Sequence, residues 1–170
     1  METLTYIALG SNLGDRQGHL DAALAAIRAL PGVPGVSGVS GVRMSPVYET
    51  DPVVSPGGPA GQDKFLNSVA AVKTTLAPEA LLVELMKIEA ERGRPTRAER
   101  VFQGPRPLDL DIVLFGDRVI DQPGLTVPHP RMHERWFVLR PLCDLDPDVL
   151  HPVLKRTAAQ MLADLEAPLG

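Results

Sequence analysis

The segment at residues 108–115, LDLDIVLF, restricts the possible folds of this 170-residue chain more than any other part of it. Apolar residues alternate with aspartate over its first five positions, and successive side chains of a β-strand point to opposite faces of the sheet. The pattern therefore predicts a strand with its apolar side chains buried. Asp109 and Asp111 then lie together on the opposite face, with Cα atoms about 6.7 Å apart.

Two carboxylates at this separation repel each other, and a bound cation would relieve the repulsion. An incomplete set of oxygen ligands suits Mg²⁺, which keeps water molecules and takes further ligands from substrate phosphates. The alternative is an ordinary amphipathic strand whose two acids are solvated. The DxD spacing taken alone does not decide between these interpretations.

The segment before this strand, residues 92–106, is strongly basic. It holds five arginines and one acid, a net charge of +4 in a chain whose total is −4. Guanidinium groups bind phosphate oxygens, so arginines beside paired acids are typical of a metal–polyphosphate site. A solvated loop is the alternative for the arginines. The sequence has neither GxxxxGK[ST] nor GxGxxG, so side chains and metal ions would have to hold a phosphate.

Hydrophobic periodicity and turn residues predict the order strand, helix, strand, strand, helix, strand, followed by a tail with a hairpin and short helices. The strands are expected at residues 3–9, 39–49, 65–75 and 108–115, and the helices at 20–30, 78–93, 133–142 and 155–165. This is the split βαβ order of ferredoxin-like α+β folds. Asp15 is expected to cap the first helix and Gly93 to end the second.

Two segments rich in glycine or proline are expected to be loops. Residues 31–42 read PGV, PGV, SGV, SGV, which we interpret as a loop expansion that leads into a strand. Residues 50–64 hold three prolines and three glycines, and loops of this length in compact domains are often functional. We expect this loop and residues 94–106 to close over bound substrates.

The length fits one domain, residues 1–170, and the negative net charge argues against a general nucleic-acid binder. A lone cysteine, Cys143, excludes an intramolecular disulfide and a cysteine-rich zinc module. No apolar run reaches about 18 residues, and the N-terminus lacks signal-peptide features. We therefore expect a cytoplasmic monomer without a membrane or nucleic-acid partner.

The histidines and aromatic residues are less informative. His129 and His133 are four residues apart, but prolines on both sides of His129 disfavour a helical zinc pair, and a nucleotide contact is the better interpretation. His19 and His151 are expected at the surface. Phe65 and Asn67 share a strand face and would suit a flat heterocycle, although a core phenylalanine beside an edge asparagine is the simpler reading.

The segment GPRPLDLDIVLFG at residues 104–116 closely resembles a signature of the bacterial 6-hydroxymethyl-7,8-dihydropterin pyrophosphokinase family of folate biosynthesis. YIALGSNLG at residues 6–14, FLN at 65–67, LAPE at 76–79 and LTVPH at 125–129 are similar to further segments of that family, in the same order. The resemblance implies a ferredoxin-like α+β domain that binds ATP, two Mg²⁺ ions and a pterin. It implies transfer of diphosphate from ATP to the pterin hydroxymethyl group, with release of AMP.

The resemblance also implies roles for individual residues. Asp109 and Asp111 would ligate both magnesium ions, and Arg94 and Arg106 would hold the transferring phosphates. The nucleotide site would include Glu89, Arg97, Arg100, Ile112, Thr126, His129 and Arg135. The pterin would lie between Phe65 and Phe137, its edge bound by Asn67 and by the backbone near Thr50 and Val53.

The sequence departs from the family pattern at a few positions. Gly124 stands where many members have a basic residue before LTVPH. Thr96 replaces a second arginine, whose part Arg97 is expected to take. Val101 and Gln103 lengthen the arginine loop around Phe102, the residue expected to close over the site.

Two other functions fit parts of the sequence. Gly10-Ser11 with DxD also occurs in polymerase-β-like nucleotidyltransferases, but there the two elements are close in sequence, and here most of the chain separates them. A ferredoxin-like ligand sensor without catalysis would account for the fold, but it leaves the paired acids and the arginine loop unexplained. The products formed from Mg-ATP distinguish the three functions.

Overall fold

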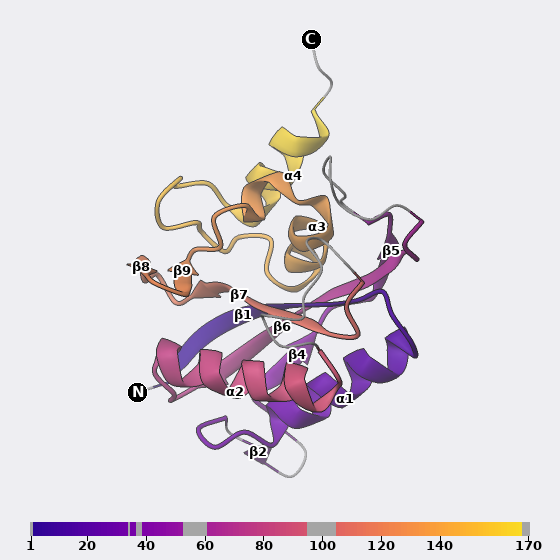
Figure 1. Ribbon diagram of the computed structural model, residues 1–170. Helices are drawn as coiled ribbons and strands as arrows, with labels where there is room; N and C mark the ends of the chain where they lie inside the picture. The colour runs from indigo at the N-terminus through magenta and orange to yellow at the C-terminus, as the bar shows by residue number, and fades with distance from the viewer. Residues whose placement is uncertain (1, 34, 37–38, 53–60, 95–104, 168–170) are drawn as a thin grey trace.

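The computed structural model describes residues 2–33, 35–36, 39–52, 61–94 and 105–167 (Figure 1). Its centre is a five-stranded sheet in which β7, β1, β6 and β4 are successive antiparallel neighbours and β5 also pairs with β6. The strands are β1 (Thr3–Ser11), β4 (Val42–Met44), β5 (Tyr48–Thr50), β6 (Phe65–Thr74) and β7 (Asp109–Phe115).

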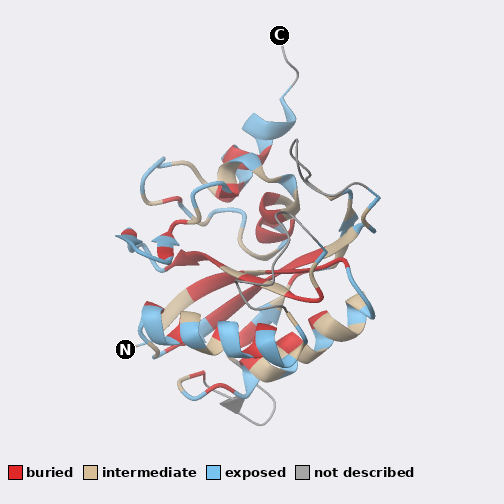
Figure 2. Cartoon of the chain, in the orientation of Figure 1, coloured by how far each residue is buried: buried red, intermediate tan, exposed pale blue. Residues whose placement is uncertain are grey.

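Helices cover both faces of the sheet (Figure 1). On one face, α1 (Arg16–Arg28) and α2 (Pro78–Glu91) bury a cluster that includes Ile7, Leu20 and Leu85. On the other, α3 (Trp136–Leu145) and α4 (Ala158–Glu166) bury a second cluster with the opposite face of the same strands. Figure 2 shows the buried residues concentrated in the sheet and on the inner sides of the helices.

Apart from the strand expected at 39–49, the elements expected for the two βαβ halves are present with small shifts of their ends. Asp15 caps α1, since its Oδ1 accepts a hydrogen bond from the backbone N–H of Gly18 at 3.0 Å. Gly93 follows α2 with φ +88°, a conformation in which glycine has no steric penalty. Both predicted helix ends are confirmed.

The continuous strand predicted at residues 39–49 is wrong. The chain instead forms β3 (Val39–Ser40), β4 and β5, and β3 pairs with β2 (Gly35–Val36) in a small hairpin outside the main sheet. Between β4 and β5 lies Pro46, which has no N–H for a sheet ladder. The N–H of Ser45 donates to the carbonyl of Val69 at 2.9 Å, and its hydroxyl accepts a hydrogen bond from the N–H of Val69 at 2.9 Å. The PGV/SGV repeat is therefore partly a hairpin rather than a plain loop.

The tail after β7 contains one predicted hairpin and two predicted helices. The hairpin pairs β8 (Ile120–Gln122) with β9 (Leu125–Val127), and a 3₁₀ turn, η2 (Met132–Glu134), precedes α3. The expectation that His151 lies at the surface is wrong, because its side chain is buried and accepts hydrogen bonds from the N–H groups of Val153 and Leu154. Within the described part of the chain, no helix has the length and apolar character to cross a membrane.

Candidate active site

A pocket opens on the face of the sheet that carries α3, with about 820 Å³ of space when its open mouth is included. Nine of the residues expected at the site line it: Thr50, Phe65, Asn67, Arg106, Asp109, Asp111, His129, Arg135 and Phe137. They come from strands β5, β6 and β7 and from the segment that leads into α3.

Strand register explains why these side chains meet. Residues directly opposite in an antiparallel pair share a face, and β1 sets Gly10 opposite both Asp109 and Asn67. It also sets Ala8 opposite Asp111. The two small residues of β1 leave the space above the sheet open, whereas longer side chains at these positions would fill it. The pocket is therefore encoded in β1 as much as in the polar residues around it.

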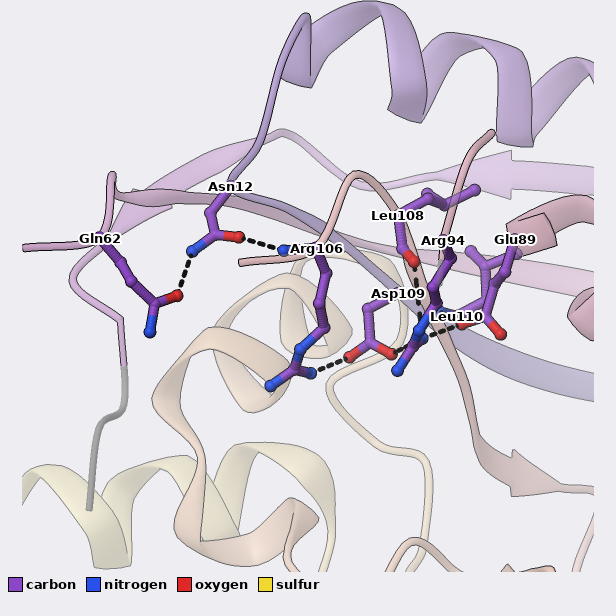
Figure 3. A network of polar contacts seen from close by, with 8 residues as sticks. All are labelled: Asn12, Gln62, Glu89, Arg94, Arg106, Leu108, Asp109 and Leu110. Atoms are coloured by element: carbon purple, nitrogen blue, oxygen red, sulfur yellow. Dashed lines mark hydrogen bonds and ion pairs between the residues drawn. The ribbon is translucent and has the colours of Figure 1, made fainter. Parts of the chain in front are cut away.

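Asp109 is held by two arginines (Figure 3). Its Oδ1 accepts from Nη1 of Arg94, and its Oδ2 accepts from Nη1 of Arg106 at 2.9 Å. Burial would raise the pKa of this carboxyl, but the two guanidinium groups outweigh burial and lower the pKa. Asp109 is thus an anion at neutral pH. Its carboxylate has further lone pairs through which it can also bind a cation.

Asp111 lies in a different environment, although it shares the same face of β7. Within the described part of the chain, no hydrogen bond or ion pair engages its carboxylate. Burial, followed by repulsion from Asp109 and Glu89, raises its pKa to about 7. A cation beside Asp111 would remove this penalty, so the donor set fits a divalent ion.

The protein ligands for such an ion are few. Within the described residues, no group of three or more histidine, cysteine, aspartate or glutamate side chains is arranged to hold a metal. Two carboxylates with the remaining positions open to water and phosphate oxygens match the way that Mg²⁺ is bound with nucleotides. The site thus fits Mg²⁺ that arrives with a polyphosphate better than a permanently held metal.

Glu89 supports the arginines from the other side of the sheet. It lies near the end of α2 with 6% of its surface exposed, and its Oε2 accepts from Nη1 of Arg94 and from the backbone N–H of Leu110 at 2.8 Å (Figure 3). Glu89 is not among the pocket-lining residues. It orients Arg94, which in turn contacts Asp109.

The two arginines differ in how far their side chains are exposed. The side chain of Arg94 is 11% exposed and is fixed between Glu89 and Asp109, whereas that of Arg106 is 31% exposed and lines the pocket. The Arg106 guanidinium also lies over the Phe65 ring, 5.8 Å from its centroid. The Arg106 guanidinium therefore lies at the pocket, whereas that of Arg94 is buried between two carboxylates.

Aromatic and amide side chains line the pocket next to the acids and arginines. Asn67 donates from Nδ2 to the hydroxyl of Thr50 at 2.6 Å, which leaves its Oδ1 near Gly10. Phe65 lies on the same face of β6, and Phe137 projects from the first turn of α3 with the Arg135 guanidinium 5.5 Å from its ring centroid. These aromatic and amide side chains suit a flat heterocycle, and the neighbouring acids and arginines suit a polyphosphate.

His129 is a neutral ring at the edge of the pocket. Its Nδ1 accepts a hydrogen bond from the N–H of Arg131 at 3.1 Å, so the ring proton is on Nε2. Burial, and then the positive charges of Arg135 and Arg131, lower its pKa to about 4. The ring can donate one hydrogen bond from Nε2 to a ligand without carrying charge.

Some expected site residues are not brought to the pocket. Ile112 packs in the cluster beneath α1 and α2, because strand alternation turns it away from Asp111. Thr126 is exposed on β9 and does not line the pocket. Val53, Arg97 and Arg100, together with Phe102, lie outside the described residues.

The sequence interpretation missed two charged residues that line the pocket, Asp51 and Arg131. Asp51 follows β5 directly, and Arg131 precedes the 3₁₀ turn that leads to α3. Neither lies in a periodic segment, and the only signal for Asp51 was its place in the loop at 50–64 that is expected to close over substrates. Arg131 is two residues beyond His129, and this closeness to an expected site residue was the only available signal for it.

The fold and the site define an α+β protein with a pocket whose residues suit a metal-bound polyphosphate beside a flat ring, an arrangement typical of phosphoryl-transfer enzymes. More specifically, the chain belongs to the 7,8-dihydro-6-hydroxymethylpterin-pyrophosphokinase (HPPK) family, whose model matches residues 6–147.

Relatives from several bacteria are similar over most of their length. The 2-amino-4-hydroxy-6-hydroxymethyldihydropteridine pyrophosphokinase of Pseudomonas aeruginosa is 47% identical over 147 residues, 86% of this chain and 83% of the relative. The Bacillus subtilis enzyme of the same name is 45% identical over 145 residues, 85% of this chain and 79% of the relative.

Solved structures share the fold at low sequence identity. A crystal structure of an HPPK-DHPS in complex with substrates matches with a TM-score of 0.67 and 14% identity, over 96% of this chain and 43% of that one. A Plasmodium falciparum HPPK-DHPS matches with a TM-score of 0.69 and 16% identity, over the same shares of the two chains. The chain thus spans less than half of these longer proteins.

Proposed function

We propose that this protein transfers diphosphate from ATP to the hydroxymethyl group of 6-hydroxymethyl-7,8-dihydropterin and releases AMP, a step of folate biosynthesis. Its membership of the HPPK family supports this activity. The observation that carries the proposal is the shared face of β7, where Asp109 and Asp111 lie beside Arg106 in a pocket that is also lined by Phe65, Asn67 and Phe137.

Asp109 and Asp111 are the residues that would hold Mg²⁺, and we propose two ions, as the family resemblance implies. Bound Mg²⁺ would supply charge neutralisation at the triphosphate and polarise the reacting phosphate. Arg106, with Arg94 behind Asp109, would take the transferring phosphates, and His129 and Arg135 the nucleotide. Arg97 and Arg100 are proposed to contact the nucleotide as well.

For the pterin, we propose a position between Phe65 and Phe137. Asn67, fixed by Thr50, would read the polar edge of the ring with its remaining amide hydrogen and carbonyl oxygen, and the backbone near Val53 would add to this edge. Such a placement turns the hydroxymethyl group toward the acids and arginines. Ile112 and Thr126 have no place in this arrangement, and Glu89 acts through Arg94.

The reaction needs alignment and charge compensation more than covalent catalysis. The pterin hydroxyl oxygen forms a bond to the β-phosphorus of ATP, and the bond from that phosphorus to the oxygen of the α-phosphate breaks. AMP leaves with the electron pair, and the hydroxyl proton passes to solvent or a phosphate oxygen. Arg106 compensates the charge that develops on the transferred group, and the aromatic walls exclude water from the attacking hydroxyl.

We further propose that the chain is a single ferredoxin-like domain that acts as a cytoplasmic monomer. The strand order β7-β1-β6-β4, with α1 and α2 packed together on one face, supports the split βαβ assignment. The small-molecule substrates are ATP and the pterin, and the proposal includes no nucleic-acid or membrane partner.

The test is product analysis from Mg-ATP with and without hydroxymethyldihydropterin. The expected result is AMP release that depends on the pterin, with one diphosphorylated pterin formed per AMP. Release of diphosphate would indicate a nucleotidyltransferase instead. Binding of both compounds without turnover would indicate a ligand sensor.

A further inference from the structure

Strand β5 carries Thr50 into the pocket but has little sheet support of its own. It is three residues long and, among the described strands, pairs only with β6. Tyr48 and Thr50 are two residues apart in this strand, so both side chains lie on the face that looks toward α3. Whatever holds Tyr48 therefore also sets the position of Thr50.

Tyr48 contacts residues at both ends of α3. Its hydroxyl donates to Oδ2 of Asp144, near the last turn, and its ring meets the Trp136 ring, in the first turn, edge to face. The ring centroids are 5.5 Å apart, with an angle of 85° between the planes. Oδ1 of Asp144 also accepts from Nη2 of Arg140 at 3.0 Å, which fixes the carboxylate on its own helix.

Helix α3 forms the facing wall of the same pocket. Its first turn contributes Phe137 and Val138, and Arg135 precedes it. Neither Tyr48, Trp136 nor Asp144 lines the pocket, so these residues have no direct contact with a ligand there. They do connect the strand that carries Thr50 with the helix that carries Phe137.

We propose that Tyr48, Trp136 and Asp144, the β5–α3 brace, are positioning residues that set the distance between the Thr50–Asn67 edge and the Phe137 wall. This inference rests on the proposed function, because it assigns the braced part of the pocket to the pterin ring. A flat ring between two walls is sensitive to their separation, whereas triphosphate binding depends on β7 and the arginines. Loss of the brace therefore weakens pterin binding more than ATP binding.

The chain offers a matched control. Tyr6 donates from its hydroxyl to Oδ2 of Asp146, the residue after α3, and Asp146 also pairs with Arg43 at 2.7 Å. This is the same kind of tyrosine–aspartate hydrogen bond between the sheet and the end of the same helix. It involves neither β5 nor a residue that lines the pocket.

The kinetic test compares Tyr48→Leu and Tyr48→Phe with Tyr6→Phe. We expect Tyr48→Leu to raise the KM for hydroxymethyldihydropterin about tenfold, the effect of misplacing one wall, with the KM for ATP changed less than about twofold. Tyr48→Phe, which keeps the ring on Trp136, is expected to have a smaller effect, and Asp144→Asn, which keeps an acceptor, a smaller one still. Tyr6→Phe should leave both KM values unchanged.

An unchanged pterin KM in Tyr48→Leu would overturn the proposal, and so would an equal rise in Tyr6→Phe. A second readout does not depend on activity. Trp136 is the only tryptophan of the chain, so its fluorescence reports on the ring contact directly. We expect a shift in its emission in Tyr48→Leu but not in Tyr6→Phe.

The two readouts separate the possible failures. If the wild-type protein shows no pterin-dependent AMP release, the proposed function fails, and the pterin assignment fails with it. The emission shift still tests whether Tyr48 contacts Trp136 in solution. If the wild-type enzyme is active but the emission and the pterin KM do not change in Tyr48→Leu, the brace alone is wrong.

Discussion

At the scale of single residues, Asp109 and Asp111 share a strand face and yet differ in charge balance. Two arginines compensate Asp109, whereas burial, followed by repulsion from Asp109 and Glu89, raises the pKa of Asp111 to about 7. Asp109 thus has charged partners within the protein, and the charge balance of Asp111 supports the proposal that a bound ion compensates it. This division leads to a prediction in which activity and stability change in opposite directions.

We predict that Asp111→Asn lowers kcat at least about 100-fold, the usual effect of removing one electrostatic contact to the transition state. Without metal, the same variant should be at least as stable as the wild type, because a repelling buried charge is lost. The measurements are AMP release and thermal unfolding in EDTA. Near-normal turnover would show that Asp111 does not hold the metal, and a large loss of stability would show that its carboxylate has a structural partner.

Glu89 leads to the opposite prediction, a loss of stability. Its carboxylate is buried and shared between Arg94 and the N–H of Leu110. Glu89→Ala leaves both groups buried with a partner missing, so we expect a loss of about 3 kcal/mol in the free energy of unfolding. Glu89→Gln should lose about 1 kcal/mol, because its amide oxygen still accepts from Leu110.

Urea denaturation of the two variants measures these losses. The control is Glu91→Ala in the same helix, where the side chain is exposed and a change within about 0.5 kcal/mol is expected. Equal stability of Glu89→Ala and the wild type would contradict the bridging role of Glu89.

At the scale of elements, β1 makes the pocket possible by placing Ala8 and Gly10 under it. A Cβ at Gly10 would lie 3.4 Å from Oδ1 of Asn67 and 3.6 Å from the Phe65 ring. An alanine fits there, but the larger side chain of valine would enter the space assigned to the pterin. We predict that Gly10→Val raises the KM for the pterin at least about tenfold, while Gly10→Ala has a small effect.

Steady-state kinetics with each substrate varied in turn measures this effect, and circular dichroism confirms that the sheet is retained. A pterin KM that is the same in Gly10→Val and Gly10→Ala would mean that the ring does not lie over β1.

The elements also show what sequence can and cannot predict. The alternation in β7 placed the two aspartates on one face without any tertiary information, and the spacing in α1 and α2 gave two helices with one buried side each. The strand predicted at 39–49 is wrong because residues 45–47, which include Pro46, interrupt it, and β-forming residues on both sides hid the break. The repeat before it gave no signal for the pairing of β2 with β3.

Contacts between elements on the two faces of the sheet could not be predicted from local sequence patterns. Glu89 is 20 residues before Asp109 and on a helix that packs on the other face, so only the fold brings it to Arg94 and Leu110. Likewise, Tyr48 and Asp144 are brought together by the packing of α3 on the sheet. Such contacts depend on the strand register and on the order of the layers. The whole sequence determines both together, and no single segment determines either alone.

At the scale of the whole molecule, the free energy of unfolding depends on pH through two sets of groups whose protonation has opposite effects on stability. Burial raises the pKa of Glu89 and, with its acidic neighbours, that of Asp111, so their protonation favours the folded state as the pH falls from 7. Burial lowers the pKa of His129 and His151. The unfolded chain therefore binds more protons at these histidines below pH 6.5, and their protonation favours unfolding.

The contribution of His151 to the pH dependence of stability can be isolated by comparing the wild type with a variant that lacks this histidine. His151→Asn keeps a side-chain acceptor for the N–H groups of Val153 and Leu154 but removes the titration. We predict that the stability of the wild type relative to this variant falls as the pH decreases below 6.5. Urea unfolding at several pH values measures the difference. A difference independent of pH would show that His151 titrates alike in the folded and unfolded chains.

The central claim is that the carboxylates of residues 109 and 111 together hold the magnesium that accompanies ATP. A crystal structure with Mg²⁺, a non-hydrolysable ATP analogue and hydroxymethyldihydropterin tests it most directly. We predict Mg²⁺ at about 2.1 Å from an oxygen of each carboxylate and from phosphate oxygens, with the pterin ring between Phe65 and Phe137. A triphosphate bound with its magnesium away from both carboxylates would contradict the claim.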